Sequence, residues 1–238
     1  MSGVLEVDGL SAGYFGQRVI HEVDLAVQAG EVVCLLGSNG VGKTTTLLAL
    51  SGELKPMSGT VSFAGLGPRS PLHRRARRGL SYVTEERSVF KAMTARENLR
   101  CAGVSVDEVT ALFPELEKCI DTKGGLLSGG EQQMLTLGRA LARRPKLLLA
   151  DELSLGLAPL VVDRLLTAVR TAAKESGTGA LIVEQHVRKA LKHADRVYLM
   201  RRGRIELALT AAEARSRIDE IERSYLSSAV LAEDRAPE

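Results

Sequence analysis

The sequence predicts an α/β fold in which a mostly parallel sheet, covered by helices, is joined to an N-terminal antiparallel β-subdomain and a helical subdomain. Three patterns in the chain of 238 residues support this prediction. The first thirty residues alternate between apolar and polar positions, residues 94–143 carry apolar side chains at helical spacing, and strands then alternate with helices. We expect one domain over residues 1–230, with a helical insert at about 93–143 and a flexible tail at 231–238.

The N-terminal elements are predicted from alternation and from glycine. Residues 4–7 and 23–27 show the apolar and polar alternation of half-exposed antiparallel strands. Gly30 then turns the chain into residues 32–36, an uninterrupted apolar run that predicts a buried strand. Two further short strands are expected at 60–63 and 80–83.

The remaining elements follow two different periodicities. Apolar residues recur at helical spacing over 106–116 and 134–141, with breaks at Pro114 and at the glycine pair 124–125. Beyond these helices, extended and helical patterns alternate, which predicts a mostly parallel sheet covered by helices. The expected order is strand, helix, strand, helix, strand at 146–150, 160–174, 180–183, 187–192 and 197–200.

Composition excludes several classes of protein. Hydrophobic residues make up 45% of the chain, yet the longest apolar runs are too short to cross a bilayer and no signal-peptide pattern opens the sequence. The cysteines Cys34, Cys101 and Cys119 show neither a paired framework nor a metal-ligand spacing, so reduced thiols are expected. A net charge of +3 with 3% aromatic residues does not indicate nucleic-acid binding. We expect a soluble, cytoplasmic protein.

One concentration of basic residues stands out in the sequence. We expect it to form the solvated face of a helix, with contact to an anionic lipid or a partner protein as the alternative. Its members are Arg69, Arg74, Arg75, Arg77 and Arg78.

A glycine-rich loop joins the strand predicted at 32–36 to the start of a helix. Glycines at 37, 40 and 42 are expected to take positive φ, so that backbone N–H groups can surround phosphate oxygens. Lys43 is placed to reach the β- and γ-phosphates, and Thr44 to ligate Mg²⁺. Strand, loop and helix together predict a P-loop NTPase core; a chance glycine-rich turn is the alternative. The expected nucleotide contacts are Gly37, Ser38, Asn39, Gly40, Val41, Gly42, Lys43, Thr44 and Thr45.

Two carboxylates follow a second predicted strand. Asp151 and Glu152 come directly after apolar residues 147–150, at the strand end where open α/β sheets bind ligands. Asp151 is expected to hold Mg²⁺ through its water shell, and Glu152 to polarise an attacking water. The alternative is that both acids only cap the following helix.

Residues 127–133, Leu-Ser-Gly-Gly-Glu-Gln-Gln, resemble the signature sequence of ATP-binding-cassette (ABC) ATPases. Ser128, Gly129, Gly130 and Glu131 begin a predicted helix whose N-terminus can bind an anion, although an ordinary helix cap is the alternative. The resemblance extends over about residues 4–204. It implies an ABC ATPase cassette, ATP and Mg²⁺ as ligands, and a head-to-tail dimer with ATP between one subunit's loop and the other's signature.

The resemblance assigns roles to further positions. Tyr14 lies where the family stacks an aromatic ring on adenine, unless it is a core residue. Glu85 lies where the family has a glutamine that ligates Mg²⁺, and a carboxylate can replace that amide. Leu153 replaces the proline that usually follows the two acids, which can loosen the turn. The family's switch histidine, which contacts the γ-phosphate, falls at Gln185 or His186; a structural role for the histidine stays open.

Several segments resemble the shorter of the two ATPases in branched-chain amino-acid importers, namely 131–135, 143–149, 154–159 and 183–185. Glu85 fits the same subfamily. The start of the helical insert, 93–125, is shorter than that resemblance implies. Because the insert is where such ATPases grip the permease, a divergent partner or substrate is expected.

These features predict an ATP-hydrolysing subunit of an importer for branched-chain amino acids or similar solutes. The resemblance implies transmembrane permease subunits, a second ABC ATPase subunit, identical or different, and indirectly a solute-binding protein as partners, at the inner face of the cell membrane. One alternative is a cassette serving a urea, amide or lipid transporter. Another is a non-transport ABC switch protein acting on ribosomes or DNA, which a single cassette without a strong basic face disfavours.

Overall fold

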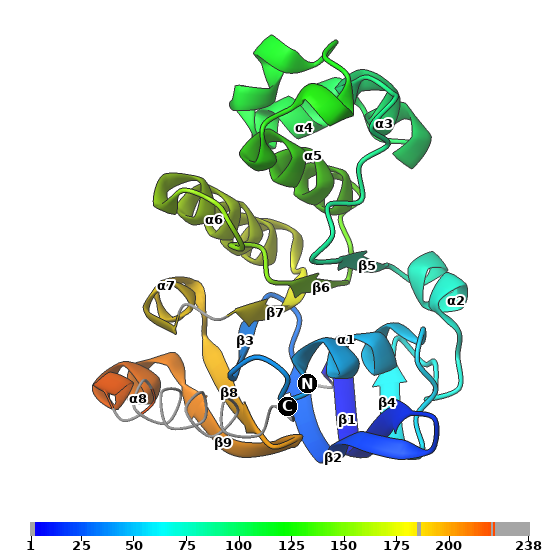
Figure 1. Ribbon diagram of the computed structural model, residues 1–238, viewed down its shortest axis with the longest axis vertical. Coiled ribbons are helices and arrows are strands. Elements are labelled where there is room, and N and C mark those ends of the chain that lie inside the picture. The colour runs from blue at the N-terminus through cyan, green and yellow to red at the C-terminus, as the bar shows by residue number, and fades with distance from the viewer. Residues whose placement is uncertain (1–2, 185–186, 220, 222–238) are drawn as a thin grey trace, which may run out of the picture.

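The computed structural model describes residues 3–184, 187–219 and 221. Two sheets with accompanying helices, and a lobe formed by further helices, make up this part of the chain (Figure 1). The expected α/β fold with antiparallel and helical parts is confirmed. Gln185, His186 and the tail 231–238 lie outside the described residues, so the predictions made for them stay predictions.

The smaller sheet is antiparallel and has the strand order β2-β1-β4. Leu5 pairs with Val27 of β2 on one side and with Phe63 of β4 on the other. In residues 5–8 of β1 and 22–25 of β2 the apolar residues are buried and the polar ones exposed, as the alternation predicts, whereas Ser11 of β1 is fully buried. The strands are β1 (Leu5–Tyr14), β2 (Gln17–Val27) and β4 (Ser58–Phe63).

The larger sheet has the order β5-β6-β7-β3-β8-β9, in which all neighbours are parallel except β8 and β9. Strand β3 therefore lies between two strands from the last third of the chain. The antiparallel edge strand β9, which has no buried residue, and the short helix that follows it were not predicted. The strands are β3 (Val32–Leu36), β5 (Leu80–Val83), β6 (Leu147–Asp151), β7 (Gly179–Glu184), β8 (Arg196–Arg201) and β9 (Arg204–Thr210).

The helices fall into two groups (Figure 1). One forms the lobe beyond β5: α3 (Ala95–Ala102), α4 (Val106–Leu112), the 3-10 turns η1 (Pro114–Cys119) and η2 (Gly124–Leu126), and α5 (Gly129–Ala142). The others accompany the sheets: α1 (Lys43–Ser51), α2 (Leu72–Arg77), α6 (Pro159–Ser176), α7 (Val187–His193) and α8 (Ala211–Ser216). None of the helices formed by the described residues combines the length and apolar character that a membrane crossing needs.

Strand β3 is buried on both faces, which explains its uninterrupted apolar sequence. Val32, Cys34 and Leu36 pack in a core shared with α5, α6 and α7. Val33 and Leu35 pack in a second core shared with α1 and the antiparallel sheet. Because both faces are fixed by packing, the loop that follows β3 starts from a rigid strand end.

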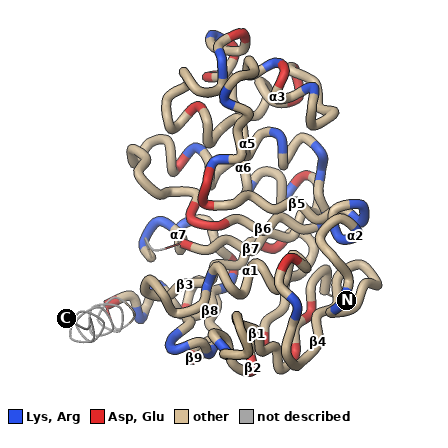
Figure 2. The backbone as a smooth tube through the Cα atoms, turned by 45° about the vertical axis from the view of Figure 1, so that its right-hand side comes forward, with Lys and Arg blue, Asp and Glu red and all other residues tan. Residues whose placement is uncertain are grey.

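The basic cluster departs from its prediction at one position. Figure 2 shows the basic residues gathered at α2, where the other four arginines of the cluster are exposed, but Arg75 is fully buried. Its Nε donates to the carbonyl of Ser70 at 3.0 Å and its Nη2 to that of Gly67 at 2.9 Å. A solvated role for Arg75 is therefore wrong: the side chain braces the segment before α2, and burial lowers the pKa of the guanidinium.

Candidate functional site

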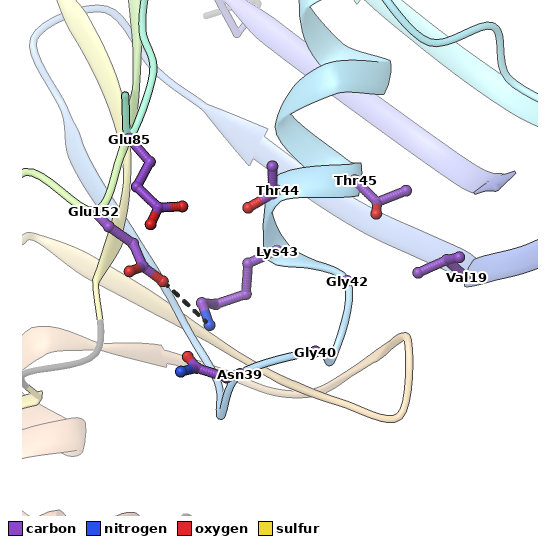
Figure 3. A pocket seen from close by; sticks show the side chains of 9 residues that line it. All are labelled: Val19, Asn39, Gly40, Gly42, Lys43, Thr44, Thr45, Glu85 and Glu152. Atoms are coloured by element: carbon purple, nitrogen blue, oxygen red, sulfur yellow. Dashed lines mark ion pairs between the residues drawn. The ribbon is translucent and has the colours of Figure 1, made fainter. Parts of the chain in front are cut away.

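A cavity of about 270 Å³ lies over the carboxyl ends of strands β3, β5 and β6, beside β2. Figure 3 shows two carboxylates on one wall, a lysine between them and the loop, and the start of α1 on the other wall. The lining residues are Val19, Asn39, Gly40, Gly42, Lys43, Thr44, Thr45, Glu85 and Glu152.

The glycines of the loop are needed for two different reasons. Gly40 and Gly42 have φ values of +77° and +107°, which only glycine adopts without strain. Gly37 was predicted to share this conformation and does not. A Cβ at Gly37 would lie 2.6 Å from the carbonyl oxygen of Met200, so this glycine permits a close approach of strand β8.

Lys43 begins α1 and turns back over the loop. Its Nζ donates to the carbonyl oxygens of Gly37 at 2.8 Å and Ser38 at 3.0 Å, and lies 3.9 Å from Oε1 of Glu152. The residue is 5% exposed, and burial lowers the pKa of its ammonium group, against the attraction of the nearby carboxylates. The cation is thus held directly beside the cavity (Figure 3).

Asp151 is the last residue of β6 and is 1% exposed. Burial raises the pKa of its carboxyl, and a hydrogen bond from the Thr44 side chain acts in the opposite direction. Its Oδ1 is buried without a hydrogen-bond partner. A buried carboxylate oxygen without a partner is costly, and a hard cation or its water shell would satisfy it.

The side-chain atoms available to bind a cation are oxygens that come from different helices, strands and loops. Thr44 comes from α1, Asp151 from β6, and the exposed Glu85 follows β5 and lines the cavity. The described residues contain no group of three His, Cys, Asp or Glu side chains able to hold a metal ion alone. This donor set suits an ion that shares its coordination with phosphate oxygens and water.

Glu152 has a backbone conformation that the sequence did not predict. Its φ is +47°, in the left-handed region that is unfavourable for a residue with a side chain. The backbone N–H donates to the carbonyl of Val183 at 3.0 Å, and Leu153 buries its side chain in the core with 1% exposure. Leu153 therefore anchors this turn by packing, in place of proline.

Helix α5 carries the signature residues in the helical lobe, and they do not line the cavity. Ser128 caps the helix: its Oγ donates to Glu131 Oε2 at 2.8 Å and accepts from the Glu131 N–H at 3.3 Å. Hydrogen bonds from the side chain and backbone of Ser128 lower the pKa of the Glu131 carboxyl. Ser128 is exposed, and Gly129 and Gly130 are half-buried beside the side chains of Arg87 and Val161.

Tyr14 and Val19 are two residues whose relation to the cavity differs from the prediction. Tyr14 ends β1 with 41% exposure but is not among the lining residues. Val19 of β2 lines the cavity and was missed. Ile20 next to it faces the core, so Val19 lies on the opposite face of the strand. An apolar residue on that outer face was the sequence signal that could have indicated a binding surface.

Comparison with known proteins identifies the family. The family model described as ABC transporter matches residues 20–154, more than half of the chain. The chain belongs to the ABC transporter family. It is an ABC ATPase, an ATP-binding and ATP-hydrolysing subunit of a transporter, and subunits of this kind dimerise and work with transmembrane permease components.

Relatives of this ABC ATPase serve different transporters. It is 39% identical over 222 residues to the high-affinity branched-chain amino acid transport ATP-binding protein BraG of Pseudomonas aeruginosa, covering 88% of this chain and 94% of the relative. It is 35% identical over 214 residues to the lipopolysaccharide export system ATP-binding protein LptB of Escherichia coli K12, covering 84% and 88%. A solved ATP binding subunit of an ABC transporter matches with a TM-score of 0.79 and 29% identity, covering 94% and 99%.

Proposed function

We propose that this ABC ATPase energises the import of branched-chain amino acids or similar solutes. The observation that carries the proposal is the 39% identity to BraG, whose name states that transport, over 88% of this chain. The protein would lie at the inner face of the membrane, bound to permease subunits and supplied indirectly by a solute-binding protein.

ATP would be bound between two ATPase subunits. The loop of one subunit, from Gly37 to Thr45, supplies backbone N–H groups and the ammonium of Lys43 for the phosphates. Residues 128–131 cap a helix away from this cavity, so they would close over the nucleotide of the second ATPase subunit. Tyr14, exposed at the end of β1, would stack on the adenine, with Val19 nearer the phosphates.

Mg²⁺ would be held by Thr44 and Glu85, with Asp151 binding its water shell through the buried Oδ1. When bound, the ion neutralises charge on the transferred phosphoryl group. A hydrogen bond from the Thr44 side chain holds the Asp151 carboxylate beside the start of α1, and the ammonium of Lys43 would bind the phosphates.

Glu152 would orient and deprotonate the attacking water. Its carboxylate lines the cavity and lies 3.9 Å from Lys43 Nζ, so base and phosphate-binding cation face the same space. Gln185 or His186, which follow β7, would contact the γ-phosphate as the switch residue.

Glu152→Gln tests this assignment. The variant keeps the shape of the side chain and removes the base, so it should bind ATP with unchanged affinity, lose turnover and accumulate as an ATP-bound dimer. Turnover measured by phosphate release and dimer formation measured by size-exclusion chromatography report these effects. Glu53→Gln, an exposed glutamate after α1, is the matched control. Wild-type turnover by Glu152→Gln would refute the base.

A lipid exporter is the second candidate, because LptB of Escherichia coli is 35% identical over 84% of this chain. The two functions differ in partner and in cargo. Uptake of radiolabelled leucine should fall in a deletion strain of the native host, and should return with the wild-type gene but not with the Glu152→Gln gene. Unchanged uptake, together with co-purification of a lipid exporter's permease, would reject the function in import and support the function in lipid export.

A further inference from the structure

Strand β7 ends between the two halves of the candidate site. In the sheet order β6-β7-β3, it separates the strand that carries the acidic turn from the strand that leads into the phosphate loop. Val183 of β7 is in register with Asp151 of β6, and Glu184 with Leu36 of β3. The end of β7 is therefore in direct backbone contact with both strand ends.

A buried hydrogen bond crosses this junction from the acidic turn. Ser154 Oγ donates to Glu184 Oε2 at 2.6 Å, a length typical of a hydroxyl on an ionised carboxylate. Ser154 is 6% exposed and Glu184 is 1% exposed. A carboxylate at this depth is stable only when it is hydrogen-bonded, so the pair is a constrained element of the structure rather than a surface contact.

The turn that contains Ser154 begins at Glu152, whose backbone conformation is unfavourable. Glu152 has φ of +47°, and such a conformation persists only where the surroundings hold it. The Glu152 N–H is held by the carbonyl of Val183, and two residues later Ser154 is held by the side chain of Glu184. Both ends of the turn are thus attached to β7.

We propose that Ser154 and Glu184 are positioning residues that hold the Glu152 carboxylate opposite the phosphate loop. This inference rests on the proposed function, in which Glu152 is the base. Neither residue is among those that line the cavity, so they act through the turn and through β7. They should influence the rate of hydrolysis and leave nucleotide binding, which depends on the loop and α1, unchanged.

Ser154→Ala and Ser154→Thr separate this role from simple packing. Removing the hydroxyl should lower kcat about tenfold, as expected for loss of a hydrogen bond to a charged group, while KM and the dissociation constant for ATP stay unchanged. Threonine keeps the hydroxyl and should restore kcat. Ser62→Ala, on the exposed side of β4, is the control and should keep wild-type values. Wild-type kcat in Ser154→Ala, or a loss of ATP affinity equal to the loss of kcat, overturns the proposal.

A double-mutant cycle with Glu184→Gln tests whether the two residues act as a unit. Glutamine preserves the size of the side chain, and melting temperatures of all variants show whether they remain folded. The double variant should be no slower than the slower single variant, whereas two independent losses that multiply would overturn the pairing.

Measuring the Glu152→Gln variant together with the Ser154 variants distinguishes a failure of the positioning role from a failure of the proposed base. An inactive Glu152→Gln with a fully active Ser154→Ala removes only the positioning role. A fully active Glu152→Gln removes the base and the positioning role with it.

Discussion

Nζ of Lys43 and Oε1 of Glu152 lie 3.9 Å apart, one at the start of α1 and the other just beyond β6. The two groups come from segments that are distant in sequence. The lysine also donates to two carbonyls of its own loop. Its ammonium group is therefore fixed at the N-terminal end of α1, where phosphate oxygens would meet the helix N-terminus.

Lys43→Ala should weaken ATP binding at least about tenfold, because a buried cation that bonds to a charged ligand contributes more than a neutral hydrogen bond. Titration with a fluorescent ATP analogue measures the effect. Lys55→Ala removes an exposed lysine just beyond the same helix and should keep wild-type affinity. Equal affinities for all three proteins would contradict the assignment of the phosphate loop.

The left-handed conformation of Glu152 predicts an unusual order of stability. Glu152→Gly and Glu152→Ala both lack the carboxylate, but only glycine relieves the backbone strain at φ of +47°. The glycine variant should therefore be more stable by about 1 kcal/mol in urea unfolding. The same two substitutions at Glu86, which has no positive φ, should show alanine as the more stable variant. Alanine being more stable at both positions would contradict the strain.

Asp151→Asn should raise the Mg²⁺ concentration needed for half-maximal ATPase activity by about tenfold or more, as for other residues that orient a metal's water shell. The buried Oδ1 without a partner is the atom expected to matter, since an amide there carries no charge for the ion. Magnesium titrations at saturating nucleotide measure the shift. Asp107→Asn, an exposed acid at the start of α4, is the control, and a shift of equal size there would refute the assignment.

Arg75→Ala should destabilise the fold by about 2 to 4 kcal/mol, because it removes a buried side chain and two hydrogen bonds from a charged donor. Arg77→Ala, in the same helix but exposed, should change the free energy of unfolding by less than about 0.5 kcal/mol. Urea unfolding monitored by circular dichroism compares the two. Similar small effects would mean that the buried guanidinium contributes little.

The cysteines should differ in reactivity because of burial. Cys101 is exposed, whereas Cys34 and Cys119 are buried, and burial raises the pKa of both buried thiols. At neutral pH, a thiol reagent such as Ellman's reagent should modify one thiol rapidly in the folded protein and the other two only after unfolding. Cys101→Ser should abolish the rapid phase. A rapid phase that persists in this variant would place a buried cysteine at the surface.

Local sequence patterns were enough to predict the framework of the site. The strands predicted at 32–36, before the glycine loop, and at 146–150, before the two acids, are each contiguous, so periodicity and turn chemistry identify them, and the structure has them at Val32–Leu36 and Leu147–Asp151. The signature segment, in contrast, was recognised by its resemblance to the ABC ATPase family. Each of these motifs brings its own strand or helix, and the sheet then places both strand ends at one edge.

The parts that were not predicted depend on contacts between distant segments. The buried Arg75 looked like its exposed neighbours, because its acceptors are backbone carbonyls that carry no sequence signal. The positive φ of Glu152 and its support by Glu184 arise only when β6 and β7 are paired. Gly37 was predicted to need a positive φ, but the position requires glycine because a Cβ there would lie too close to the carbonyl oxygen of Met200 in β8.

The position of β3 in the sheet has a consequence for the synthesis of the protein. Its two neighbours, β7 and β8, are translated from the last third of the chain, long after β3 and the phosphate loop have left the ribosome. Until then the five apolar residues of β3 lack the strands that cover their edges, and such a segment is prone to aggregate or to bind chaperones. A nascent or truncated chain that lacks β7 and β8 thus carries the complete loop sequence without its support, and the ability to consume ATP arises only after these two strands have been made.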